Sequence, residues 1–111
     1  MARYRPKQGD YVVLTFDPQA GHEQAGRRPA LIVSKSNFNH HTGFALACPI
    51  TNTFRNFPFH VPVDSASTLT GYIMVEQVKS LDYTSRKLKK VGSATQETLD
   101  EVLARLDAIL Y

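Results

Sequence analysis

The sequence predicts a small, mainly β domain with a single helix at its C-terminal end. Short runs rich in Val, Ile, Tyr and Phe recur along most of the chain, with Gly, Pro, Asn and Asp between them. The last part of the chain instead repeats its apolar residues at helical spacing. This order favours a small barrel or sandwich over a parallel α/β sheet.

Length and composition indicate one ordinary globular domain that spans residues 1–111. The net charge of +3 permits attraction to nucleic acid or to an acidic protein, but it selects neither. Cys48 is the single cysteine, which excludes an intrachain disulfide. The sequence has no signal-peptide pattern and no apolar run long enough to span a membrane, so we expect a cytoplasmic protein.

The β-type runs define six predicted strands, and a polar stretch between the second and third is expected to hold a short helical turn. Cys48 falls in the third strand, where we expect a buried small hydrophobe rather than a reactive thiol. The predicted strands are Tyr11–Phe16, Ala30–Ser34, Phe44–Ile50, Phe59–Val63, Tyr72–Val75 and Lys87–Val91, and the turn is Asn37–Gly43.

The C-terminal segment predicts one amphipathic helix that packs on the strands. Capping residues at positions 93–96 precede it, and Glu101 and Arg105 are spaced to pair on its polar face. We expect its apolar stripe to belong to the core rather than to a partner's groove. The stripe consists of Leu99, Val102, Leu103, Leu106, Ile109 and Leu110.

The segment from Asp17 to Pro29 carries the densest set of functional groups. It holds His22, Glu23, Gln24 and two arginines, and apolar runs flank it on both sides. Polar loops on a rigid scaffold are where binding and catalytic residues concentrate. His22 and Glu23 could transfer protons near neutral pH, or they could simply be solvated.

Arg28 enters the second predicted strand directly before Pro29. Its planar guanidinium can hold two phosphate oxygens at once, which suits an anionic ligand. The alternative is a surface arginine that pairs with Asp17 or Glu23.

Thr51 follows the third predicted strand and could bind a phosphate oxygen or cap the turn through its own backbone. The next loop interleaves Phe54, Arg55 and Phe57, a mixture on which unpaired bases stack, although these rings could equally be buried or face another subunit. Glu76 and Gln77 end a later strand and could add polar groups to a groove. The histidines show no metal-ligand spacing, so we expect no metal site.

Several motifs, in order and at matching spacing, resemble the MazF/PemK family of toxins. The resemblance runs from about Tyr4 to the C-terminal helix, and the Glu-Gln-x-Gly-x-Arg-Pro core is its most specific part. The motifs are Gly9-Asp10, Phe16-Asp17-Pro18, Gly21-His22-Glu23-Gln24-Ala25-Gly26-Arg27-Arg28-Pro29-Ala30, Pro49-Ile50-Thr51 and Gln77-Val78-Lys79-Ser80.

The resemblance implies an SH3-like barrel of the CcdB/PemK type with a C-terminal helix, working as a homodimer. It implies the toxin of a type II toxin–antitoxin system, an endoribonuclease that cuts single-stranded RNA at short sequences without ribosome, metal or cofactor. A 2′-OH attack would leave 2′,3′-cyclic phosphate and 5′-OH ends. A cognate antitoxin would block the groove with an acidic, otherwise disordered segment, and DNA would be reached only through that antitoxin.

The resemblance also assigns roles to residues. Arg28 and Thr51 match the pair at the scissile phosphate, Glu23 matches a carboxylate needed for activity, and His22 matches a histidine implicated in some members. Glu23 is our first choice for the base and His22 for the acid. The expected RNA contacts are Asp17, Gln24, Gly26, Arg27, Thr53, Phe54, Arg55, Glu76, Gln77 and Lys79.

One position departs from part of the family. Some PemK-type members carry an Arg-x-Asp pair on a later strand for acid and base roles. Here that place reads Met74-Val75-Glu76, so the arginine is missing and only a carboxylate remains.

Two other functional classes stay open. One is a non-enzymatic toxin of the same barrel type that poisons DNA gyrase by binding, but that group relies on C-terminal residues that include a tryptophan, and this chain has no Trp. The other is an RNA-binding barrel that does not cleave.

Overall fold

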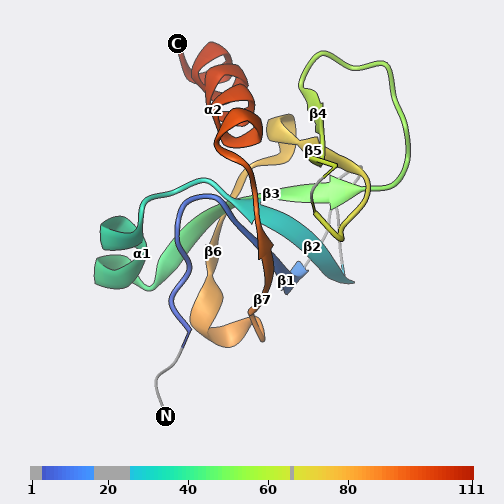
Figure 1. Cartoon of the computed structure of the whole chain (residues 1–111). Coiled ribbons are helices and arrows are strands. Elements are labelled where there is room, and N and C mark those ends of the chain that lie inside the picture. Colours follow the sequence, from blue (N-terminus) through green and yellow to red (C-terminus); the bar gives the residue numbers. More distant parts are fainter. Residues whose placement is uncertain (1–3, 17–25, 66) are drawn as a thin grey trace.

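The computed structural model describes residues 4–16, 26–65 and 67–111. Within these ranges the chain forms one antiparallel sheet with a helix at the C-terminal end, which confirms the predicted mainly β class (Figure 1). The strands are β1 (Asp10–Phe16), β2 (Gly26–Ile32), β3 (Phe44–Thr51), β4 (His60–Pro62), β5 (Tyr72–Met74), β6 (Lys79–Asp82) and β7 (Lys89–Ser93). The helices are α1 (Ser36–Thr42) and α2 (Gln96–Leu110), and η1 (Val75–Gln77) and η2 (Tyr83–Ser85) are 3₁₀ turns.

All six predicted strands occur, and the structure adds one that the sequence analysis missed. The missed strand is β6, whose residues are mostly polar and of which only Leu81 is buried. The second strand also begins earlier than predicted, at Gly26 instead of Ala30. Its polar first residues pair with β1, where Arg28 lies opposite Leu14. Polar strand residues of this kind show no alternation of apolar and polar side chains, so the hydrophobic pattern does not predict them as strand.

Strand β3 is the centre of the sheet. One of its edges pairs with β2, and the other pairs with β6 over Phe44–Ala47 and then with β5 over Ile50–Thr51. Pro49 lies between the two segments of this second edge, where its missing N–H costs no ladder hydrogen bond. The path of neighbours runs β4-β5-β3-β2-β1-β7, and within the described ranges it is not closed into a complete barrel.

Both faces of β1 are buried, which divides the interior into two clusters. Tyr11 packs with residues of β3, β5 and α2, whereas the adjacent Val12 packs with β2, β3 and β6 on the opposite face. Successive strand residues point to opposite faces, so a strand buried on both sides is expected to be continuously apolar. The sequence Tyr-Val-Val-Leu at the centre of β1 has this character.

Helix α2 starts at the predicted cap, where Thr95 accepts a hydrogen bond from the backbone N–H of Thr98. Leu99 and Val102 are buried, but Ile109 and Leu110 are 42% and 65% exposed, so the prediction that the whole stripe is core is wrong at its end. The reason is that α2 packs on η1 and β4, and its last turn extends beyond them (Figure 1). Among the described residues, neither helix has the length and apolar character needed to cross a membrane.

Cys48 is fully buried in the first cluster, as predicted. Burial, and to a smaller extent the charge of Glu76, raises the pKa of its thiol to about 12. The thiol is therefore almost entirely protonated at pH 8, and the thiolate is the reactive form.

We expect Cys48 in the native protein to resist a thiol reagent such as Ellman's reagent at pH 8, because it is both inaccessible and protonated. The same protein in guanidinium chloride should react with one equivalent, which serves as the control. Rapid stoichiometric reaction of the native protein would contradict the assigned core position.

Candidate nucleic-acid site

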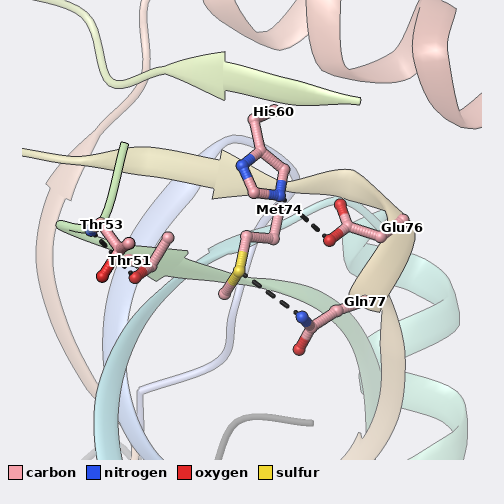
Figure 2. A network of polar contacts seen from close by, with 6 residues as sticks. All are labelled: Thr51, Thr53, His60, Met74, Glu76 and Gln77. Atoms are coloured by element: carbon pink, nitrogen blue, oxygen red, sulfur yellow. Dashed lines mark hydrogen bonds and ion pairs between the residues drawn. The ribbon is translucent and has the colours of Figure 1, made fainter. Parts of the chain in front are cut away.

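A cleft of about 490 Å³ is lined by the last residues of β3 and β5 and by the first residue of β4. It brings together five of the predicted RNA-contacting or catalytic residues: Thr51, Thr53, Arg55, Glu76 and Gln77. Asn56, Phe57, His60 and Met74 complete the lining. Figure 2 shows Thr51 and Thr53 on one side, His60 and Glu76 on the other, and Met74 between them.

Thr51 occupies the last position of β3, opposite Tyr72 of β5. Its Oγ1 accepts a hydrogen bond of 3.2 Å from the backbone N–H of Thr53, which is the turn-capping contact considered from the sequence. A hydroxyl that accepts one hydrogen bond still has its own O–H to donate. The cap therefore orients Thr51 without preventing it from binding a phosphate oxygen.

Gly71 allows β5 to approach Thr51 closely. Its φ is +125°, which residues with a side chain rarely adopt, and a Cβ there would lie 2.5 Å from the carbonyl oxygen of Thr51. Only glycine satisfies both constraints. The position of Thr51 thus depends on the absence of a side chain twenty residues further along the sequence.

Arg28 lies on β2 and is exposed. The last paired residues of β2 and β3 are Ala30 and Pro49, so Arg28 and Thr51 each lie two residues beyond this pair on neighbouring strands. Arg28 does not line the cleft itself.

His60 and Glu76 form the opposite wall. The pairing of β4 with β5 aligns His60 with Met74, and η1 then carries Glu76 back toward the imidazole. The His60 Nε2 lies 3.0 Å from a Glu76 carboxylate oxygen, and the Phe57 ring lies edge-on against the imidazole at 5.2 Å. The His60 side chain is 3% exposed and that of Glu76 is 28% exposed.

The loop between β3 and β4 lines part of the cleft and is hydrogen-bonded to α2. Arg105 donates a hydrogen bond of 2.8 Å from Nε to the carbonyl oxygen of Pro58, and it also forms the predicted ion pair with Glu101. Phe54 is 66% exposed and lies edge-on to Tyr72, and Phe57 is 43% exposed. Both rings therefore present apolar surface outward.

The remaining predicted contacts are distributed more widely. Gly26, Arg27 and Phe54 are exposed outside the cleft, and Lys79 lies on β6 opposite Ala47. Asp17, His22, Glu23 and Gln24 fall outside the described residues. The sequence analysis missed His60, Asn56 and Met74 as lining residues, because no spacing rule links them to Thr51.

Comparison with known proteins identifies the class. A family model described as "PemK-like, MazF-like toxin of type II toxin-antitoxin system" matches residues 7–110. The Escherichia coli K12 protein named endoribonuclease toxin MazF is 36% identical over 110 residues, 99% of this chain and 98% of that protein. The crystal structure of MazF from Deinococcus radiodurans has a TM-score of 0.92 and 39% identity, and covers 97% of this chain and 98% of its own.

A second crystal structure holds MazE and MazF of Deinococcus radiodurans together. It matches with a TM-score of 0.86 and 39% identity over 97% of each chain. The chain therefore belongs to the PemK-like, MazF-like family of toxins of type II toxin–antitoxin systems. This confirms the predicted family, its mainly β fold with a C-terminal helix, and the predicted enzyme class.

We expect Gly71→Ala to lower the free energy of unfolding by about 3 kcal/mol, because it adds both a strained φ and a clash with the Thr51 carbonyl. Gly43→Ala is the matched control, since Gly43 also has a positive φ but a Cβ there would meet nothing within 4 Å. Gly43→Ala should lower the free energy of unfolding by only about 1 kcal/mol. Urea unfolding measures both, and equal losses would show that Gly71 does not hold β5 against Thr51.

Proposed function

We propose that this protein cuts single-stranded RNA at short sequences, without a ribosome or a metal ion, through attack by the RNA's own 2′-OH. The observation that supports this proposal is the position of Thr51 in the lining of a cleft, with Arg28 exposed on the adjacent strand β2. A hydroxyl donor and a permanently charged fork on adjacent strands suit one phosphate group. The endoribonuclease names of the relatives support the same chemistry.

The reaction requires three groups around the phosphorus. A base removes the proton from the 2′-OH as its oxygen bonds to phosphorus, and the bond from phosphorus to the 5′ oxygen then breaks. An acid gives a proton to that 5′ oxygen, which leaves a 5′-OH and a 2′,3′-cyclic phosphate. The extra negative charge on phosphorus in the transition state needs fixed positive charge or hydrogen-bond donors.

Arg28 and Thr51 serve the phosphate in this proposal. A guanidinium is a poor base, so the role of Arg28 in this proposal is to stabilise negative charge. The Thr51 hydroxyl donates to a non-bridging oxygen. Glu23 acts as the base and His22 as the acid, on the strength of the family resemblance and of their proton-transfer chemistry. Because the nucleophile is the 2′-OH, DNA is not a substrate.

The RNA strand runs from the cleft across the neighbouring exposed surface. Phe54 offers a ring on which a base can stack, and Arg55 adds a cation for the backbone. The other contacts in the proposal are Asp17, Gln24, Gly26, Arg27, Thr53, Glu76, Gln77 and Lys79.

The partners in the proposal are a second copy of the chain and a cognate antitoxin. A MazF similar to this chain is solved together with MazE, which supports an antitoxin partner. The acidic segment of that antitoxin would compete with RNA for Arg28 and Arg55, and the exposed Ile109 and Leu110 give α2 an apolar end that a partner could cover. DNA is reached only through the antitoxin, and the protein acts in the cytoplasm.

The first test incubates pure protein with a long RNA in the presence of EDTA. We expect discrete fragments with 5′-OH ends, because the reaction uses no metal and breaks the bond to the 5′ oxygen. Intact RNA would contradict the proposal and favour a binding-only barrel, and inhibition of DNA gyrase by the same sample would indicate the non-enzymatic toxin class.

The second test examines Arg28→Ala. The variant should lose at least about 10²-fold in cleavage rate, as expected when a transition-state charge partner is removed, and should keep its fold because Arg28 is exposed. Arg5→Ala removes another exposed arginine outside the proposed site and should cleave normally. Near-normal cleavage by Arg28→Ala would place the phosphate elsewhere.

A further inference from the structure

His60 and Glu76 form a hydrogen-bonded pair in the cleft, and the proposed function does not explain the role of this pair. The imidazole is almost fully buried, and its Nε2 lies 3.0 Å from a carboxylate oxygen of Glu76. A carboxylate only accepts, so Nε2 must carry the proton and donate in this contact. Glu76 is more exposed than His60, which leaves the carboxylate accessible from the cleft (Figure 2).

Three contacts fix the orientation of the pair. The register of β4 and β5 sets His60 opposite Met74, and the Val75 N–H donates to the Phe59 carbonyl oxygen at 3.1 Å. The Phe57 ring lies edge-on to the imidazole, with an interplanar angle of 83°. His60 therefore fixes the orientation of the Glu76 carboxylate through Nε2. The Nδ1 atom of His60 makes no hydrogen bond to any described residue.

A carboxylate in an RNA groove can attract only some of the groups that RNA carries. It repels phosphate, so within RNA its attractive partners are the N–H groups of bases and the 2′-OH.

The cleft also has the size of a small-ligand site, since its volume of about 490 Å³ lies within the range of about 300–1,000 Å³ typical of such sites. Phe57 supplies apolar surface and Thr53, Asn56 and Gln77 supply polar groups for a base edge.

We propose that Glu76, held in place by the positioning residue His60, reads one nucleobase through its N–H donors, so that the cleft accepts an amino-bearing base and rejects uracil. Adenine, cytosine and guanine each carry an exocyclic amino group that can donate to the carboxylate. Uracil has a single N–H between two carbonyl oxygens, and both oxygens would face the negative charge. This inference rests on the proposed RNA cleavage and names the specificity of that same site.

The experiment sequences the 5′ ends of fragments from a long mixed RNA cut by the purified protein. For the wild-type protein, uracil should be depleted at least about ten-fold at one fixed position near the cut, as expected for a charged acceptor facing the wrong base. Glu76→Gln has a side chain of the same shape that can also donate, so uracil should enter that same position. Base frequencies at the other positions should not change.

Two substitutions of His60 separate positioning from simple stability. His60→Gln keeps an N–H donor near the place of Nε2 and should retain the discrimination against uracil, whereas His60→Leu removes the donor and should relax it. His40→Leu changes an exposed imidazole on α1 and should behave as wild type.

The outcomes distinguish this inference from the proposed function. If the wild-type protein leaves the RNA intact, the proposed function fails. If it cuts but Glu76→Gln keeps the wild-type base frequencies at every position, cleavage stands and the base-reading role of Glu76 is overturned. Relaxation in Glu76→Gln but not in His60→Leu would overturn the role of His60.

A binding measurement covers the case in which Glu76→Gln cuts too slowly to map. Two RNAs with 2′-deoxyribose at the cut site, differing only by uracil or cytosine at the read position, are compared by fluorescence anisotropy. The wild-type protein should prefer the cytosine RNA, and Glu76→Gln should bind both alike. An unchanged preference in the variant would instead assign Glu76 to proton transfer and overturn the inference.

Discussion

The pairing of β3 with three neighbours is the constraint on which the site depends. One edge of β3 binds β2, and the other binds β6 and then β5. Its last residue, Thr51, is thereby placed between the strand that carries Arg28 and the strand that leads to Glu76. A shift of one residue in this register would turn Thr51 to the other face of the sheet. Gly71 is the local requirement that keeps β5 in register, because a side chain there would strike the Thr51 carbonyl.

The cleft next to the end of β3 is lined by side chains of both charges. Arg55 and Glu76 both line the cleft, Glu76 contacts the buried side chain of His60, and Arg28 is exposed on the adjacent strand β2. Negative charge in a groove for a polyanion weakens binding unless it meets hydrogen-bond donors. In the proposed function the arginines hold the RNA backbone and Glu76 distinguishes bases, which is the general division of labour in nucleic-acid recognition.

Much of this architecture could be predicted from the sequence, and the exceptions have physical causes. The apolar runs predicted six strands, and the helical spacing of Leu99 and Val102 predicted α2. Strand β6 was missed because its pairing with β3 rests on backbone hydrogen bonds and a single buried leucine. The contact of His60 with Glu76 spans sixteen residues and depends on the β4–β5 register and on the η1 turn, so no local pattern encodes it. The exposed end of α2 was misassigned because apolar spacing shows which face is apolar but not how far the supporting sheet extends.

We propose that RNA lies against the end of β3, between Arg28 and the cleft wall formed by His60 and Glu76. A titration of the ¹⁵N-labelled protein with an RNA that carries 2′-deoxyribose at its cut site, followed by amide chemical shifts, tests this most directly. If RNA binds there, we expect the largest shifts at Arg28, Thr51, Thr53 and Gln77, with the amides of α1 unchanged. Saturable shifts confined to α1 or to the last turn of α2, with Thr51 and Thr53 unmoved, would contradict it.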